Sequence, residues 1–307
     1  MIGASLLSLA AACGMAFGAQ PSDAPPGSKR ASIELILPTQ DLKPGSQSIV
    51  GVKFTIADGW HLYWSGQNDT GSSPTIQLSS SNPKVEFGSP RWPVPQRHVA
   101  PGDITDHIYE RGFMILVPVS IPADLAPGSA VSLTIRSKFL VCSNVCLPGE
   151  GTATLMVAAG SGADGPGKAE ISQAEKKMPE TFDAATAPFA AKFDGTTLVI
   201  TPKEGTSLES IAFFPADGCT EVNDLTGDCA SKRADGVLKP LRIGMTPNAK
   251  ATGSIGLGIV ECVNSTGAKR WIQIEVHPER APGRHDGLDE EGPSVDLKPS
   301  SSGPGRR

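Results

Sequence analysis

Residues 50–56 (VGVKFTI) place an apolar side chain at every second position, from Val50 to Ile56. Successive side chains of a β-strand point to opposite faces, so this period predicts a strand with one face in a core. The next three residues, 57–59 (ADG), are typical of a turn. The stretch therefore indicates antiparallel β-structure with short connections.

Further strands are predicted on both sides of this stretch. Residues 113–121 (FMILVPVSI), 131–140 (VSLTIRSKFL) and 152–157 (TATLMV) are rich in β-branched and apolar residues, and the segments between them carry Gly and Pro. This spacing of short strands and turns is typical of a β-sandwich. We therefore predict an all-β fold.

The composition agrees with that class. Of 307 residues, 34 are Gly and 27 are Pro, about a fifth of the chain, which argues against a helical bundle or coiled coil. The length is sufficient for two domains. The net charge of −5 excludes a basic surface of the kind that duplex nucleic acid requires.

The chain divides into six predicted segments. An uncharged apolar run followed by small residues predicts a secretory signal peptide, and residues 158–167 (AAGSGADGPG) are typical of a linker. A short helix is predicted at residues 168–180, and the dipeptide Asp194-Gly195 predicts a hairpin. The segments are a signal peptide (1–19), a flexible leader (20–31), a β-sandwich (32–158), a linker with one short helix (159–190), a second, smaller β-sandwich-like domain (191–278) and a disordered tail (279–307).

Cys142 and Cys146 carry the clearest chemical signal, because they stand four residues apart directly after a predicted strand. Closing so short a ring removes only about 2 kcal/mol of unfolded-state entropy. Small rings also tend to be strained and easily reduced. The pair can be a redox centre, a structural disulfide or half of a metal site. A zinc site would need further ligands, for which His61, His98 and His107 would have to come from other strands.

Three more cysteines lie in the second predicted domain. Cys219 and Cys229 flank a polar loop, and Cys262 lies on a later predicted strand. In an oxidising compartment two of the three are expected to form a structural disulfide and one to stay free, with the pairing open.

Four motifs in order give the chain a family resemblance. They are residues 59–74 (GWHLYWSGQNDTGSSP), 90–97 (PRWPVPQR), Tyr109 with Gly112, and 139–148 (FLVCSNVCLP). Residues 32–157 resemble the N-terminal periplasmic domain of the thiol:disulfide interchange protein DsbD, and most of all the branch in the copper-sensitivity suppressor ScsB. The resemblance implies an immunoglobulin-like sandwich whose cysteine pair alternates between dithiol and disulfide.

The resemblance also implies roles for particular residues. Cys146 matches the exposed nucleophile and Cys142 the resolving cysteine, and their exchange chemistry needs no cofactor. Residues 102–108 match a loop that caps the pair. Asp103, Asp106 and His107 become candidates for proton transfer, and Tyr109 is a further candidate at the site. We expect Trp60, Tyr63, Trp64 and Trp92 to pack in the core, and Asn68, Asp69 and Gly71 to form a turn.

The resulting hypothesis is a periplasmic thiol–disulfide exchange protein. If the protein is an enzyme, the class that this hypothesis suggests is protein-disulfide reductase. It would relay reducing equivalents from a membrane electron-transfer protein to periplasmic thioredoxin-like or thiol proteins, without a resident metal. One alternative is a copper-tolerance module that binds Cu(I) at Cys142 and Cys146, because thiolates prefer soft ions. The other is an interaction domain in which the disulfides are structural.

Overall fold

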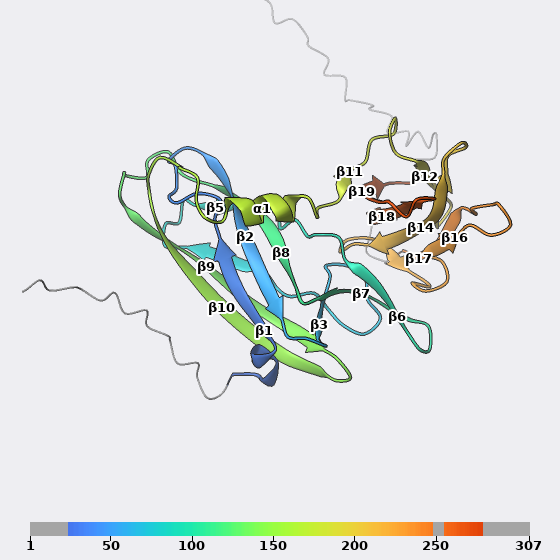
Figure 1. Ribbon diagram of the computed structural model, residues 1–307, viewed down its shortest axis with the longest axis horizontal. Helices are drawn as coiled ribbons and strands as arrows, with labels where there is room; N and C mark the ends of the chain where they lie inside the picture. Colours follow the sequence, from blue (N-terminus) through green and yellow to red (C-terminus); the bar gives the residue numbers. More distant parts are fainter. Residues whose placement is uncertain (1–23, 248–254, 279–307) are drawn as a thin grey trace, which may run out of the picture.

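The structure, a computed structural model, describes residues 24–247 and 255–278. The predicted signal peptide (1–19) and the predicted disordered tail (279–307) lie outside the described residues. Two units, each built from two β-sheets, follow one another along the chain (Figure 1). The predicted all-β class is confirmed.

The first unit is a sandwich of a four-stranded and a six-stranded sheet. The first sheet has the order β1-β2-β8-β5, with β1 (Ala31–Ile36), β2 (Gln47–Ile56), β8 (Gly112–Ser120) and β5 (Glu86–Phe87). The second has the order β10-β9-β3-β7-β6, with β10 (Cys146–Ala158), β9 (Ala130–Cys142), β3 (His61–Tyr63), β7 (Ile104–Glu110) and β6 (Gln96–Ala100), and β4 (Gln77–Ser80) also pairs with β9.

The inward-facing side chains of β2 contribute to the core between these sheets. Val52 and Phe54 are 0% and 1% exposed, and they pack with Ile115 of β8 and Ile135 and Val141 of β9. The apolar side chains at alternate positions of residues 50–56 therefore point into the sandwich, as expected.

The second unit repeats this construction on a smaller scale. One sheet has the order β11-β19-β18-β14-β16, with β11 (Glu180–Thr181), β19 (Lys269–Val276), β18 (Gly256–Asn264), β14 (Leu208–Pro215) and β16 (Ala230–Lys232). The other has the order β12-β13-β17-β15, with β12 (Phe189–Asp194), β13 (Thr197–Pro202), β17 (Leu241–Thr246) and β15 (Glu221–Val222). Phe189, Ile211 and Phe213 are fully buried between them.

One α-helix, α1 (Lys168–Glu175), is present in the described part of the chain. It lies across β2 and β8 (Figure 1) and buries Ile171 and Ala174 against Leu116. These are the two residues that the sequence placed on one face. The helix ends five residues earlier than predicted, and residues 180–181 join the second unit as β11. No helix in residues 24–247 or 255–278 has the length and apolar character needed to cross a membrane.

The expectation of a flexible leader does not hold for residues 24–31. A 3₁₀ turn, η1 (Pro26–Lys29), packs on the β9–β10 hairpin, and Ala31 already pairs with Ile56. Gly27 lies so close to the carbonyl oxygens of Leu147 and Pro148 that a Cβ would clash with them. The Ser28 hydroxyl accepts a hydrogen bond from the Glu150 N–H. These contacts offset the entropy of ordering the segment.

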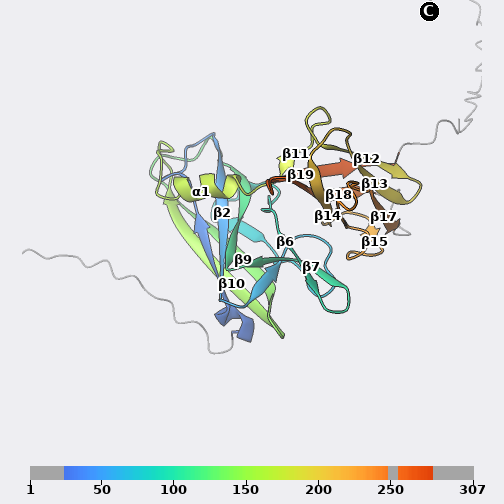
Figure 2. The ribbon, with the colours of Figure 1, turned by 45° about the vertical axis from the view of Figure 1, so that its right-hand side comes forward.

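The two sandwiches contact each other along the side of the first that carries β6 and β7 (Figure 2). Phe214 of β14 and Ile259 of β18 are buried in the same apolar cluster as Trp64 of the first sandwich. Arg97 of β6 donates hydrogen bonds to the carbonyls of Leu225 and Thr226. The second unit therefore packs directly against the strand that precedes β7.

Candidate functional site

The Cys142–Cys146 disulfide closes the end of the long β9–β10 hairpin. The two strands pair over thirteen positions, and Cys142 and Cys146 are the last pair, with Cα atoms 4.1 Å apart. Ser143 N–H donates to the Val145 carbonyl and tightens the turn. The register of the hairpin therefore brings the two sulfurs together.

The two cysteines differ in exposure. Cys142 is 1% exposed and packs with Tyr63, Ile108 and Leu140, whereas Cys146 is exposed beside Val145. Strand alternation does not separate them, because opposite residues of a pair share a face. Cys142 lies between β10 and β3, where it pairs with His61, whereas Cys146 lies on the edge strand β10. A partner from solution can reach the sulfur of Cys146.

A chain of hydroxyl groups connects Cys146 to a buried carboxylate. The Tyr63 hydroxyl lies 3.7 Å from Cys146 Sγ and 3.1 Å from Thr70 Oγ1. Thr70 donates its hydroxyl proton to Asp106 Oδ2 at 2.5 Å, and its N–H to Asp106 Oδ1 at 3.0 Å. Because the proton of Thr70 is engaged by Asp106, the Tyr63 proton is directed either to Thr70 Oγ1 or to Cys146 Sγ.

Burial raises the pKa of Tyr63 and the charge of Asp106 raises it further, whereas the hydrogen bond between Tyr63 and Thr70 opposes the rise. The phenol therefore keeps its proton at neutral pH and acts as a donor. Gly71 lies against the Tyr63 ring so closely that a Cβ has no room there. Residues 70–71 thus hold the ring in place.

Of the four residues proposed for capping or proton transfer, only Asp106 is connected to the pair. Asp103 lies in the β6–β7 turn with φ of +58°, and its carbonyl accepts a hydrogen bond from Thr226 of the second sandwich. Tyr109 is buried, stacks on Phe113 and donates to the Pro93 carbonyl. Asp103 therefore belongs to the interface between the two sandwiches, and Tyr109 belongs to the core of the first sandwich.

His107 also points away from the cysteines, because it follows Asp106 on β7 and faces the opposite side of the sheet. Its ring contacts Trp64 and Phe214, and its Nδ1 pairs with the Gln67 carbonyl at 2.8 Å. Nε2 is buried without a hydrogen-bond partner. Burial lowers the pKa of His107 to about 4.

The stretch matched to a capping loop, residues 102–108, takes a different position. It forms the turn after β6 and most of β7, which lies between β3 and β6 in the sheet. The segment that contacts Tyr63 is instead residues 65–71. A strand held on both edges by ladder hydrogen bonds cannot serve as a loop over the disulfide.

One histidine, His61, lies beside the pair, and His98 lies next to His61. His61 is opposite Cys142 in the β3–β9 ladder, and its ring centroid is 5.4 Å from that of Tyr63 and 6.2 Å from that of His98. Burial lowers the pKa of His61, and His98 lowers it further. Across residues 24–247 and 255–278, no group of three or more His, Cys, Asp or Glu side chains is arranged to hold a metal ion.

The expected disulfide among Cys219, Cys229 and Cys262 is not formed; in the structure all three are free thiols. Cys262 lies on β18 and Cys229 directly before β16, and these strands flank β14 on opposite sides. Two strand spacings separate them by about 9.5 Å, beyond the reach of a disulfide. Burial raises the pKa of these thiols to about 11 for Cys219 and about 12 for the other two.

Sequence reasoning missed Tyr63 and Thr70. Tyr63 was assigned to the core, and its ring is indeed 1% exposed, but its hydroxyl reaches the disulfide. The spacing of His61 and Tyr63 was a usable signal, because residues two apart in a strand share a face. Thr70 lies in a connection and carries no periodic signal.

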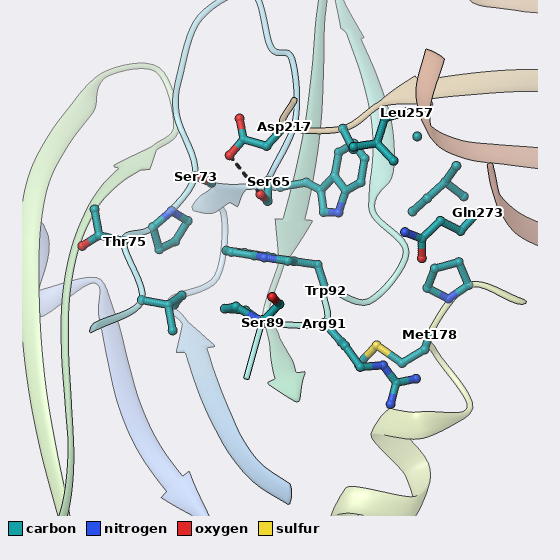
Figure 3. A pocket seen from close by; sticks show the side chains of 18 residues that line it. Ser65, Ser73, Thr75, Ser89, Arg91, Trp92, Met178, Asp217, Leu257 and Gln273 are labelled. Atoms are coloured by element: carbon teal, nitrogen blue, oxygen red, sulfur yellow. Dashed lines mark hydrogen bonds between the residues drawn. The ribbon is translucent and has the colours of Figure 1, made fainter. Parts of the chain in front are cut away.

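A cavity of about 800 Å³ lies between the two sandwiches and is separate from the disulfide. Figure 3 shows Trp92 lying across it, with Arg91 and Met178 on one side and Asp217 on the other. Ser65 donates a hydrogen bond to Asp217 across the gap at 3.3 Å. The cavity therefore belongs to the contact between the units.

Comparison with known proteins identifies the first sandwich. Residues 34–158 match the family model of the thiol:disulfide interchange protein DsbD, N-terminal. The resemblance read from the sequence is confirmed over this segment. No curated protein matches the sequence.

Solved structures similar to this chain include two domains with related descriptions. The N-terminal periplasmic domain of ScsB from Proteus mirabilis is 14% identical, and the match covers 82% of this chain and 95% of that chain with a TM-score of 0.49. The reduced DsbD N-terminal domain of Neisseria meningitidis is 17% identical, with 44% of this chain and 90% of that chain covered and a TM-score of 0.26.

Proposed function

We propose that Cys142 and Cys146 are the redox centre of a periplasmic thiol–disulfide exchange protein. The observation that carries the proposal is the unequal exposure of the two cysteines: Cys146 is exposed, whereas Cys142 is only 1% exposed. The match of residues 34–158 to the interchange family supports it. The periplasmic location follows from the same family and from the predicted signal peptide.

The exposure sets the order of bond changes. A thiolate of a reducing partner attacks Cys146 Sγ, the Cys142–Cys146 bond breaks, and Cys142 leaves as a thiolate that takes up a proton. The second thiol of the partner then attacks the mixed disulfide and releases Cys146. Two electrons and two protons have passed to this protein. The reverse sequence, started by the Cys146 thiolate, reduces the next disulfide.

Tyr63 is proposed to stabilise the Cys146 thiolate. Its hydroxyl is 3.7 Å from Sγ, and the raised pKa of Tyr63 keeps the proton in place. When Cys146 carries a negative charge, the phenol proton turns from Thr70 to the sulfur, because a charged acceptor is the stronger one. Thr70 and Asp106 keep the hydroxyl oriented between these two positions.

The partners are proposed from the resemblance to the interchange family. A membrane electron-transfer protein is proposed as the donor and periplasmic thioredoxin-like or thiol proteins as acceptors, with no cofactor bound by this chain. In that role the protein is one component of a protein-disulfide reductase system.

Measurement of the Cys142–Cys146 reduction potential tests the proposal. A value in the range of exchanging partners, above about −300 mV, is expected, and a value far below it would make the disulfide structural. Exchange should be lost in Cys146→Ser. It should persist when Cys219, Cys229 and Cys262 are all replaced by Ser, since these thiols are buried or half-buried.

The alternative function, Cu(I) binding, would use the same two sulfurs. Titration of the reduced protein with Cu(I) distinguishes it from thiol–disulfide exchange. Binding no tighter than that of a simple dithiol peptide is the result expected from the exchange role.

A further inference from the structure

Residues 65–71 run between the two sandwiches before they reach the redox site. The segment leaves β3 after Trp64, and an isolated antiparallel bridge pairs Gly66 with Ala216 of the second sandwich. A Cβ at Gly66 would clash with the Pro215 carbonyl oxygen, so the two backbones are in close approach. The segment ends at Thr70 and Gly71, which contact Tyr63.

On one side, the segment is bound to β7. Asn68 Oδ1 accepts the His107 N–H and Asp69 Oδ2 accepts the Thr105 N–H, each at 2.6 Å. The Asp69 N–H donates to the Thr105 carbonyl. These bonds fix the position of the segment along β7 and bring Thr70 to Asp106.

On the other side, Gln67 binds the second sandwich with both ends of its amide. Nε2 donates to the carbonyls of Thr220 at 3.0 Å and Cys219 at 3.3 Å, and Oε1 accepts the Val222 N–H at 2.8 Å. The Gln67 N–H also donates to the Pro215 carbonyl. One side chain thus satisfies three backbone groups of the second unit.

We propose that Gln67 is a positioning residue, through which the second sandwich holds residues 65–71 against Tyr63 and so sets the reactivity of Cys146. This inference rests on the proposed function. It assigns the second sandwich a part in the exchange reaction, although none of its own residues contacts the disulfide in the described structure.

The physical reason lies in the two-sided attachment. Without the Gln67 amide, the Val222 N–H and two carbonyls lose their partner. Toward the second sandwich, the segment then keeps only the contacts near its start, at Ser65, Gly66 and the Gln67 backbone. Its end at Thr70 and Gly71 is then held against the Tyr63 ring from the β7 side alone, through Asp106, and less firmly than before. A hydroxyl that is not held near Sγ stabilises a thiolate less, because hydrogen-bond strength falls steeply with poor geometry.

The test compares the pH profile of Cys146 alkylation in full-length reduced protein, read by mass spectrometry of the Cys146 peptide. The variants are Gln67→Ala, Gln67→Glu and the control Gln77→Ala, which removes an exposed glutamine from β4. Gln67→Glu keeps an acceptor for Val222 but cannot donate to the two carbonyls. The same set is repeated with Tyr63→Phe in the background.

Both Gln67 variants should move the midpoint of the profile upward, by up to about the one pH unit expected for Tyr63→Phe. Gln77→Ala should match the unchanged protein. In the Tyr63→Phe background, Gln67→Ala should add nothing, because both changes act through the same hydroxyl. Thermal unfolding of each variant shows whether it is folded.

Two results would overturn the inference while leaving the proposed function intact. One is a Gln67→Ala profile equal to that of the unchanged protein. The other is a Gln67→Ala shift of the alkylation midpoint that has the same size with Tyr63 and with Phe at position 63. Such a shift would mean that the substitution loosens the site without acting through the Tyr63 hydroxyl. Failure of the proposed function looks different: the unchanged protein itself would show no exchange between its Cys142–Cys146 disulfide and a dithiol.

Discussion

Replacement of Tyr63 by Phe removes the hydroxyl that lies 3.7 Å from Cys146 Sγ and leaves the buried ring in place. The ring packs with Ile108 and Cys142, so the apolar contacts that support the site are retained. The Thr70–Asp106 hydrogen bonds do not involve Tyr63 and should also persist. The substitution therefore separates the donor from the packing.

A hydrogen bond to a charged group contributes about 1.5–3 kcal/mol, and the 3.7 Å separation favours the lower end. At 1.36 kcal/mol per pH unit, its loss moves the alkylation midpoint of Cys146 up by about one unit. Well below both midpoints the thiolate share falls about tenfold. The remaining thiolate is about threefold more nucleophilic, so the rate at neutral pH falls only about threefold.

The assay follows alkylation of the reduced protein from pH 6 to pH 11. The variant should react about threefold more slowly at the neutral end and about threefold faster at the alkaline end, where both forms are ionised. Crossing of the two curves is the diagnostic result. Curves that are parallel, or a variant slower at every pH, would refute a thiolate-stabilising role for the Tyr63 hydroxyl.

Further predictions concern the cysteines, the interface and the packing of the site. Cys142→Ser should trap partners as mixed disulfides at Cys146, identified on non-reducing gels, whereas Cys146→Ser should trap none. His107 has a pKa of about 4 in the folded protein, below its usual value, so the unfolded state binds its proton first on acidification. Stability should therefore fall between about pH 6.5 and pH 4 by on the order of 3 kcal/mol in urea titrations, and His107→Gln should lack this loss. Gly71→Ala places a methyl group against the Tyr63 ring and should cost about 1–3 kcal/mol, and a thermal midpoint equal to that of the unchanged protein would contradict that packing.

Local pattern was sufficient for several strands and for the position of the main cysteine pair, but not for β7, where the resemblance had implied a loop. The period in residues 50–56 predicted β2 with the correct face inward, and the spacing of Ile171 and Ala174 predicted the buried side of α1. Cys142 and Cys146 are neighbours in sequence, so one hairpin register brings them together. Such features depend on a few adjacent residues and need no knowledge of the rest of the chain.

Long-range contacts explain what the sequence did not reveal. The pairing of Cys229 and Cys262 is prevented by the strand order, because β14 lies between their strands. Asp106 and His107 are adjacent in sequence, yet only Asp106 faces the redox site. Which face of β7 meets the disulfide and which meets the second sandwich is a property of sheet assembly.

The sequence by itself therefore determined an all-β chain with a cysteine pair at the end of a hairpin, since alternation and four-residue spacing are local. Only the tertiary structure decided that Tyr63, Thr70 and Asp106 form one hydrogen-bonded chain beside the exposed Cys146. It also brought Gln67 to the second sandwich, about 150 residues away along the chain. The physical reason is that hydrogen bonds act over about 3 Å in space, whatever the separation of their partners in sequence.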